Sequence, residues 1–308
     1  MNEDFIEAIR SDDLSKLRAF FEKCEAFRES IAPIFQLEVI VDANVIISDL
    51  IWLVKVRRYK QARTRLQELI DSETILAYAP SVLKAEVSKH LSSIAKKEGL
   101  AIEDLAAEWQ EYANKIVFED LAYQPANLPP DERDPDDLPY IKLQQRTGAR
   151  IYTKDKDISA MGGVTIGYTV IAHLRDYSRH AAIEYTIKYQ GVVIAVLSKN
   201  SAKLLFSFIK SLAISARKLP SWVWFVACGV LIVGLLNPTS RNLIVTWISS
   251  LPVKAMKIGL KVVKFTEPFV LEHQKAQEKA IAALNAVGLE LQGRNVQQPF
   301  TFLEGKRE

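Results

Sequence analysis

The chain has 308 residues, of which 49% are hydrophobic and 25% are charged, so it is long enough for about two domains and apolar enough to bury a core. Its net charge of +3 divides unevenly, because residues 1–160 carry a net charge of −7 and residues 161–308 carry +10. An acidic first half joined to a basic, apolar second half indicates two separate roles. The two cysteines, Cys24 and Cys228, provide neither a zinc-ligand spacing nor a disulfide framework.

The first half alternates predicted strands and helices. After an N-terminal helix over residues 1–30, short apolar runs predict four strands: LEVIVD (37–42), TILAYA (74–79), KIVFE (115–119) and RIYT (150–153). The helices predicted between them cover residues 43–70, 81–97, 101–114 and 138–146. The first is expected to break near residues 55–65. Ser81 is the expected N-cap of the second, and Gly148 is expected to close the fourth. This alternation predicts an α/β fold with a central parallel sheet and helices on its faces. The acidic start MNEDFIEAIR lacks the apolar core of a signal peptide, so we expect the first half to stay in the cytoplasm.

The second half has a different pattern, with long helices predicted over residues 168–218 and a break at Gly191. Residues 219–240 contain no charge and carry two tryptophans near one end, which predicts a transmembrane helix. The alternative is a buried core helix of a second globular domain. More basic residues precede this run than follow it, so the first half is expected on the cytoplasmic side. The regular lysine spacing over residues 254–265 predicts an amphipathic helix at a membrane surface.

Acidic residues follow each predicted strand. Asp42 ends the first, and Glu86 lies in the second turn of the helix after the second. The stretch DERDPDDLPY (131–140) then puts five carboxylates into seven residues, and Asp155 and Asp157 follow the fourth strand. Each acid taken alone could cap a helix or lie on a surface, but the carboxyl ends of parallel strands meet at one edge of a sheet. Carboxylates gathered there need a neutralising cation, and oxygen ligands suit Mg²⁺ or Mn²⁺.

The segments VDANVIIS, DPDDLPYIKLQQRTGA and IYTKDKDI, with Glu86 between the first two, resemble the motifs of PIN domains in order and spacing. The resemblance covers about residues 37–166. It implies a three-layer α/β/α fold and a Mg²⁺- or Mn²⁺-dependent nuclease, with four residues that bind metal and carry catalysis: Asp42, Glu86, Asp137 and Asp155. Five further residues would support these ligands or substitute for one of them: Asn44, Thr153, Asp134, Asp136 and Asp157.

The acidic stretch before the helix at 138 has a second interpretation. One acid at the N-cap, with Pro139 in the first turn, is enough to start that helix. Asp137 best matches the family ligand, and Asp136 is its closest rival. Asp131 and Glu132 are expected to be solvated loop residues.

The stretch KVRRYKQARTR (55–65) could supply the positive charge that a nucleic-acid backbone needs beside an acidic metal site. The predicted contacts are Arg57, Arg58, Lys60 and Arg63. The alternative is a solvated helix face balanced by Asp49 and Glu68.

The sequence as a whole predicts five parts: a helical extension (1–36), a PIN-like nuclease domain (37–166), a helical linker (167–218), a transmembrane helix (219–240) and an amphipathic helical tail (241–308). The predicted function is a membrane-tethered endoribonuclease with a one- or two-metal mechanism, acting as a toxin of a toxin–antitoxin pair or as a stress-response RNase. Its predicted partners are RNA, a membrane, an antitoxin protein and a second copy of the chain. The alternative is a membrane-anchored PIN-fold protein that binds partners without cleaving. A haloacid-dehalogenase-like phosphatase fits less well, because that class needs an aspartate where Asn44 stands.

Overall fold

The computed structural model describes residues 13–23, 34–121, 136–197, 242, 246 and 253–293. The chain divides into two compact units, one formed by residues 1–20 and 179–281 and the other by residues 21–178 and 282–308. We call the second the sheet unit and the first the helical unit, and describe each by itself.

The sheet unit contains five strands, all parallel, in the order β3-β2-β1-β4-β5. Their bounds are Leu37–Val41 (β1), Ile75–Pro80 (β2), Val117–Glu119 (β3), Arg150–Tyr152 (β4) and Thr165–Ile166 (β5). The predicted parallel sheet is therefore confirmed, and its four predicted strands are present. The fifth strand was not predicted, since two residues are too few for a periodic signal.

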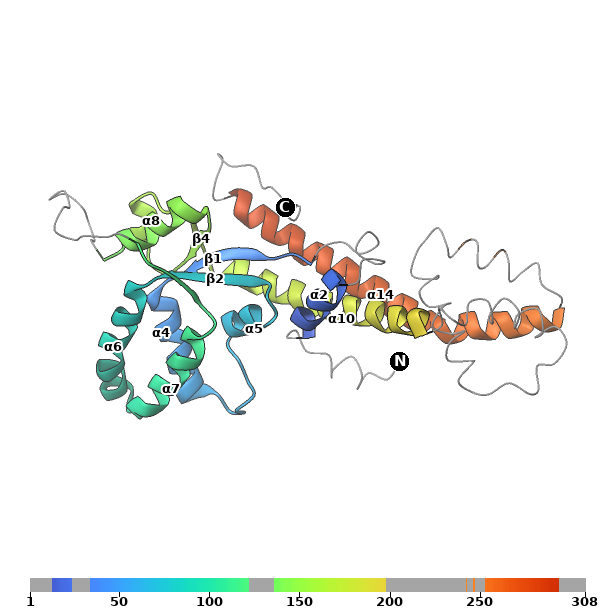
Figure 1. Ribbon diagram of the computed structural model, residues 1–308, viewed down its shortest axis with the longest axis horizontal. Helices are drawn as coiled ribbons and strands as arrows, with labels where there is room; N and C mark the ends of the chain where they lie inside the picture. The colour runs from blue at the N-terminus through green and yellow to red at the C-terminus, as the bar shows by residue number, and fades with distance from the viewer. Residues whose placement is uncertain are drawn as a thin grey trace. The chain divides into compact units, whose positions relative to one another are not determined.

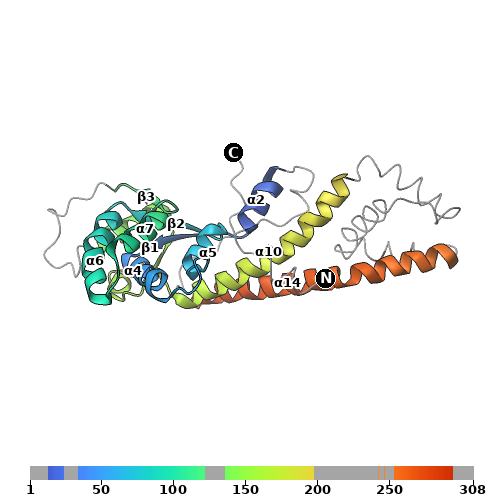
Figure 2. The ribbon, with the colours of Figure 1, turned by 90° about the horizontal axis from the view of Figure 1, so that it is seen from below.

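Helices cover both faces of this sheet (Figure 1). Helices α4, α6 and α7 lie on one side and α8 on the other, and Figure 2 shows the same group from below. Right-handed crossovers explain the arrangement, because the chain moves outward from β1 to β3 and then turns back to β4. The helices of the unit are α4 (Ala43–Ile51), α5 (Arg65–Asp71), α6 (Val82–Glu98), α7 (Ile102–Ala113), α8 (Leu138–Thr147), α9 (Asp157–Ala160) and the first part of α10 (Tyr168–Leu197).

The helix predicted over residues 43–70 is broken, as expected, near the basic stretch. Helix α4 continues into a π-helical turn, Trp52–Val56, and an irregular segment over residues 57–64 leads to α5. Thr64 starts α5 with a capping box, in which its hydroxyl accepts from the Gln67 amide and the Gln67 side chain accepts from the Thr64 amide. The alternative of a solvated helix face is wrong for residues 57–64, which are not helical.

Two predicted helix ends have different outcomes. Gly148 ends α8 with φ of 73°, a left-handed conformation that glycine adopts without steric cost, as predicted. Ser81 stands at the N-cap position of α6, but its hydroxyl donates to the Asp120 carboxylate instead of accepting from a helix amide. Both of these residues lie just beyond strand ends, so the bond connects β2 to β3.

The core of the sheet unit is continuous and draws on distant parts of the chain. The last three residues of β1 are fully buried, and the start of α10 contributes Val170 and Leu174 to the same core. Val287 and Leu291, near the end of α14 (Val253–Gly293), also belong to it. The Arg150 guanidinium donates to the Leu291 carbonyl oxygen at 3.1 Å. The unit therefore includes C-terminal residues beyond the predicted domain of residues 37–166.

The helical unit contains α2 (Asp13–Lys23), the later part of α10 and most of α14. Leu14, Tyr185 and Ala276 are buried in it, and the rings of Phe20 and Tyr189 meet edge to face at 4.6 Å. The predicted break at Gly191 is wrong, because α10 continues through it to Leu197. Residues 254–265 are helical, as predicted, but their role at a membrane stays a prediction.

Among the helices that the structure describes, none combines the length and apolar character needed to cross a membrane. The predicted transmembrane segment, residues 219–240, lies outside the described residues.

Candidate active site at the carboxyl edge of the sheet

Asp42 is the first acid at the carboxyl edge of the sheet. It follows β1 directly and holds the N-cap position of α4 with an extended backbone, and its side chain is 2% exposed. Its backbone amide donates to the Tyr152 carbonyl oxygen at 3.2 Å, which fixes the end of β1 against β4. The sheet therefore holds this carboxylate in a buried, fixed position.

The Thr153 hydroxyl joins Asp42 to Asp155. It donates to Asp42 Oδ2 at 2.5 Å and accepts from the Asp155 backbone amide at 2.8 Å. The Asn44 side-chain amide also donates to Asp42 Oδ2, at 3.4 Å. Two of the five residues predicted to support or replace the ligands, Asn44 and Thr153, thus contact Asp42.

Glu86, on α6, accepts a hydrogen bond from a residue that was not predicted from the sequence, Tyr140. The Tyr140 hydroxyl donates to Glu86 Oε2 at 2.9 Å, and the Tyr140 side chain is 1% exposed. Tyr140 lies in the first turn of α8, three residues after Asp137. A buried tyrosine needs a partner for its hydroxyl, but sequence alone does not say which of the chain's carboxylates provides it.

The remaining predicted residues have different positions. Asp137 occupies the N-cap of α8, but its side chain does not bond the helix amides, so capping does not account for it. Asp136 lies beside it in the turn before α8, and Asp134 lies outside the described residues. Asp157 begins α9, and its backbone amide donates to Asp155 Oδ1 at 2.9 Å. Asp157 therefore holds Asp155 through its backbone rather than through its carboxylate.

Burial changes the proton affinity of these groups. Loss of hydration raises the pKa of the Asp42 carboxyl, while hydrogen bonds from Thr153 and Asn44 act in the opposite direction. Burial also raises the pKa of the Tyr140 phenol, and the negative charges of Glu86 and Asp42 add to the rise. Both carboxylates are therefore close enough to influence one phenol, although they come from α6 and from the end of β1.

These donors suit a hard divalent cation, because carboxylate oxygens are the ligands that Mg²⁺ and Mn²⁺ prefer. A cation beside Asp42 would also offset the cost of burying its charge. Over the described part of the chain, no three His, Cys, Asp or Glu side chains are grouped closely enough to hold a metal ion. The chemistry of the donors fits the predicted metal, and the four-ligand assignment stays a prediction.

The basic stretch lies away from this edge. Helix α4 and the π turn carry the chain roughly 20 Å along the helix axis from Asp42 before residue 57 is reached. Arg57 pairs with Glu108 at 2.5 Å and Arg63 with Asp71 at 2.7 Å, whereas Arg58 and Lys60 are exposed. Two of the four predicted nucleic-acid contacts thus take part in ion pairs within the sheet unit.

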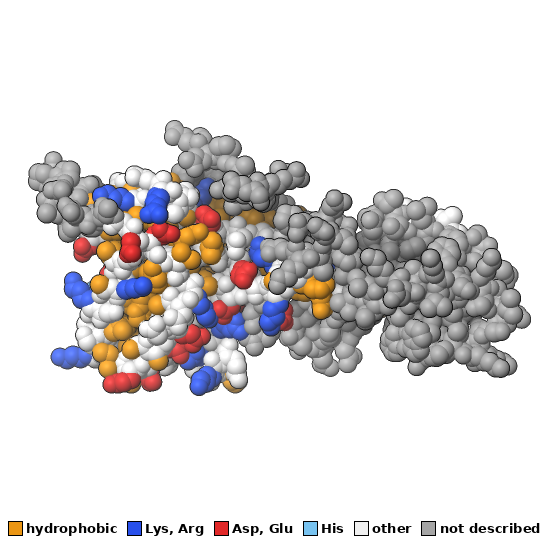
Figure 3. All heavy atoms as spheres, in the orientation of Figure 1, with side chains coloured by type: hydrophobic (Ala, Val, Ile, Leu, Met, Phe, Trp, Pro, Cys, Tyr) orange, Lys and Arg blue, Asp and Glu red, His pale blue; other side chains and the backbone are white. Residues whose placement is uncertain are grey.

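A lysine that the sequence analysis missed lies at the carboxyl edge itself. Lys154, between Thr153 and Asp155, is exposed, and its ammonium donates to the Ser48 hydroxyl at 2.9 Å. On the face drawn in Figure 3, basic and acidic side chains of the sheet unit are interspersed rather than gathered into one basic stripe.

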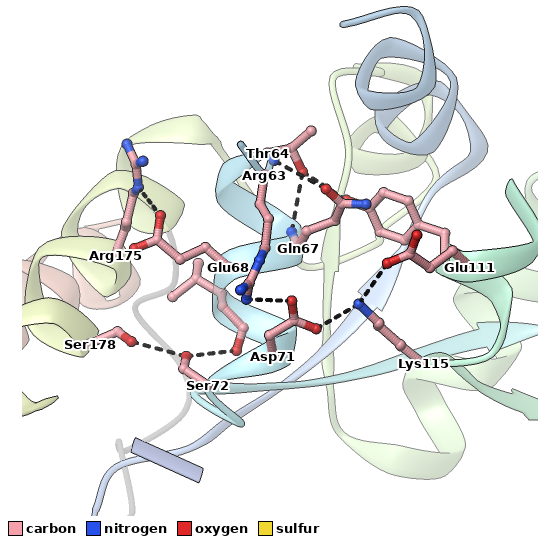
Figure 4. A network of polar contacts seen from close by, with 12 residues as sticks. Arg63, Thr64, Gln67, Glu68, Asp71, Ser72, Glu111, Lys115, Arg175 and Ser178 are labelled. Carbon is pink, nitrogen blue, oxygen red and sulfur yellow. Dashed lines mark hydrogen bonds and ion pairs between the residues drawn. The ribbon is translucent and has the colours of Figure 1, made fainter. Parts of the chain in front are cut away.

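The amino edge of the sheet carries a different polar network (Figure 4). Arg175 of α10 donates to the Glu68 carboxylate at 2.6 Å, and the Ser178 hydroxyl donates to Ser72 at 2.9 Å. Asp71 accepts from both Arg63 and Lys115, at 2.7 and 2.8 Å. These contacts fasten α5 to α10 and to the segment before β3. Glu68 pairs with Arg175, and Asp49 accepts from Tyr112 at 2.6 Å, so both of these bonds come from residues outside the basic stretch.

The fold and this site define a class of protein: a small parallel α/β domain with acidic residues, Asp42 and Asp155 among them, at the carboxyl edge of its sheet. The family model of the PIN domain matches residues 40–181, a range that contains all four predicted ligands and extends into α10. The match supports a member of the PIN-domain family. PIN domains are generally metal-dependent nucleases that act on RNA. The match therefore also supports a nuclease, which is a hydrolase. Among curated proteins and among solved structures, no match to the chain was found.

Proposed function

We propose that the chain is a Mg²⁺- or Mn²⁺-dependent endoribonuclease that hydrolyses RNA phosphodiester bonds. One observation carries the proposal: within the segment that matches a PIN domain, the Thr153 hydroxyl bonds both the Asp42 carboxylate and the Asp155 backbone amide at the carboxyl edge of the sheet. A second hydroxyl, that of Tyr140, bonds the Glu86 carboxylate. Asp42, Glu86, Asp137 and Asp155 would hold one or two cations. When bound, the cation supplies positive charge that stabilises the phosphate as its ester bond is cleaved.

The chain's own residues hold this site in place. Thr153 and Asn44 fix the Asp42 carboxylate, and the Asp157 amide fixes Asp155. Asp42 is buried, so water competes little for its oxygen atoms. Arg58 and Lys60 are exposed and free to meet an RNA backbone, although at a distance from the acids.

The biological setting rests on sequence patterns alone. The charge-free run at residues 219–240 supports a membrane tether, and the basic residues before it support a domain that faces the cytoplasm. The resemblance to PIN-domain toxins supports a role in a toxin–antitoxin pair, with an antitoxin protein and a second copy of the chain as protein partners. Fractionation tests the tether: an intact chain recovered wholly in the soluble fraction without detergent rules it out.

A cleavage assay tests the activity. Purified full-length chain is mixed with RNAs of varied sequence and with Mn²⁺, beside the variants Asp42→Asn and Asp155→Asn. We expect both variants to lose about 100-fold or more in rate, because removal of a supporting group alone costs a metal site about 10–100-fold and these variants change the ligands themselves. Asp104→Asn, an exposed acid on α7, is the matched control and should cleave like the unmodified chain. Equal rates in all four proteins would overturn the site.

A second candidate is a PIN-fold protein that binds partners without cleaving. It is favoured by the observation that the described side chains do not form a three-carboxylate group. The same assay separates the two candidates. Mn²⁺ binding without cleavage of any tested RNA would favour the binding protein.

A further inference from the structure

Tyr140 contacts a predicted ligand that lies on a different element from those held by Asn44 and Thr153. Its hydroxyl donates to Glu86, and its ring stands in the first turn of the helix that Asp137 begins. The Tyr140 backbone amide donates to the Asp137 carbonyl oxygen at 3.1 Å. The charge of Asp42 acts on the same phenol. The Tyr140 hydroxyl thus bonds one predicted ligand, Glu86, and lies close enough to a second, Asp42, to be affected by its charge.

The bond to Glu86 has a clear physical consequence. Glu86 lies in the second turn of α6, and a glutamate side chain turns about several single bonds, so it does not hold one position without a partner. A hydrogen bond from a hydroxyl to a carboxylate is about twice as strong as one between neutral groups. The Tyr140 ring is fixed by its burial in the core, so its hydroxyl is a fixed point for the carboxylate.

We infer that Tyr140 is a positioning residue of the candidate metal site, whose hydroxyl holds Glu86 toward Asp42 so that the two carboxylates can share one divalent cation. This inference rests on the proposed function, because it assumes that these carboxylates bind metal. It adds a residue that acts through Glu86 rather than on the substrate. The competing interpretation is that Tyr140 is an ordinary core tyrosine whose hydroxyl happens to find a partner.

The sheet unit offers a matched control for that interpretation. Tyr112 is also fully buried, and its hydroxyl donates to a carboxylate, Asp49 Oδ2, at 2.6 Å. Asp49 is not among the predicted ligands. Tyr112→Phe and Tyr140→Phe therefore remove the same group from the same kind of environment, but only the second change touches a predicted ligand.

The experiment measures Mn²⁺ affinity of the full-length chain by titration, with free Mn²⁺ followed by electron paramagnetic resonance. We expect Tyr140→Phe to bind Mn²⁺ about 10–100-fold more weakly, as for other groups that orient metal ligands. Tyr112→Phe should keep the affinity of the unmodified chain, although both variants should melt at a lower temperature. Unchanged Mn²⁺ affinity in Tyr140→Phe, or an equal loss in Tyr112→Phe, would overturn the inference.

A double variant tests whether Tyr140 acts through Glu86. In a Glu86→Gln background, Tyr140→Phe should cause little further loss of Mn²⁺ affinity, because the carboxylate that it positions is gone. Additive losses would show that Tyr140 acts by another route and would sink the inference. Failure of the proposed function has a separate signature: tight Mn²⁺ binding that depends on Tyr140, with no RNA cleavage. A chain that binds no Mn²⁺ would overturn both.

Discussion

The acidic residues at the two edges of the sheet have different kinds of hydrogen-bond partner. At the amino edge, Glu68 pairs with Arg175, and Asp71 pairs with Arg63 and Lys115, so positive charge meets negative charge within the fold. At the carboxyl edge, Asp42 is held by a hydroxyl and an amide, and Glu86 by a phenol. Neutral donors fix a carboxylate without cancelling its charge. The ion pairs of the amino edge therefore contribute to stability, whereas under the proposed function the carboxylates of the carboxyl edge would hold a cation.

The sharpest test of this comparison removes one hydroxyl from each edge. Thr153→Val takes the donor from Asp42 and the acceptor from the Asp155 amide, and Mn²⁺ affinity should fall about 10–100-fold. Thr74→Val removes another buried hydroxyl, one that bonds to Ser72 at the amino edge. It should lower the free energy of unfolding by about 1 kcal/mol and leave Mn²⁺ affinity unchanged. Similar Mn²⁺ affinities in the two variants would break the comparison.

The ion pair at the amino edge gives the next largest effect. Arg175→Met leaves the Glu68 carboxylate, which is 8% exposed, without its cation, and should cost about 2 kcal/mol of unfolding free energy. Urea denaturation measures this loss, and Mn²⁺ titration should show no change. The double variant with Glu68→Gln should be less destabilised than the sum of the two single changes. A clear loss of Mn²⁺ affinity in Arg175→Met would contradict the division between the edges.

Under the proposed function, the exposed basic residues should determine how RNA binding depends on salt. Replacing Arg58 and Lys60 by Gln should reduce the slope of log affinity against log salt by about 1.4, since each phosphate contact on a single strand contributes about 0.7. Arg57→Gln should lower stability instead, because Arg57 is paired with Glu108. Fluorescence anisotropy with Ca²⁺ in place of Mn²⁺ measures the slopes. An unchanged slope in the double variant would show that Arg58 and Lys60 do not contact RNA.

The same salt dependence of RNA affinity can be measured for a lysine at the carboxyl edge, Lys154. Lys154→Gln should reduce the slope by about 0.7, because this exposed lysine stands beside Asp155. Lys97→Gln, an exposed lysine in the last turn of α6, is a suitable control. Equal slopes in the two variants would show that RNA does not reach Lys154.

The smallest expected effect is a change in how the free energy of unfolding depends on pH, caused by the Asp49 carboxyl. Burial raises the pKa of this carboxyl above its ordinary value of 3.8, despite hydrogen bonds from Thr64 and Tyr112. The folded chain therefore holds the proton more tightly than the unfolded chain, and the stability from this group is lost as pH rises through the raised pKa. The Asp49→Asn variant does not lose stability in this way. Its free energy of unfolding should therefore rise relative to that of the unmodified chain as pH increases from about 4. Denaturation at several pH values checks this, and a constant difference would contradict the raised pKa.

Much of the sheet unit followed from short stretches of sequence. Buried parallel strands are continuous apolar runs, and a strand that ends in an acid places that acid at the carboxyl edge, so LEVIVD located both β1 and Asp42. The glycine that ends α8 was equally predictable, because the left-handed conformation favours that residue. These features depend on neighbours in the chain, which a sequence displays directly.

The pairings between distant side chains came only from the tertiary structure. Tyr140 and Glu86 are 54 residues apart, and Arg57 and Glu108 are 51 apart. The order of the strands and the packing of the helices determine which of many carboxylates each donor meets. The sequence by itself determined which acids reach the edge of the sheet. Tertiary packing decided which neutral donors hold them, and which basic residues are used in ion pairs at the opposite edge.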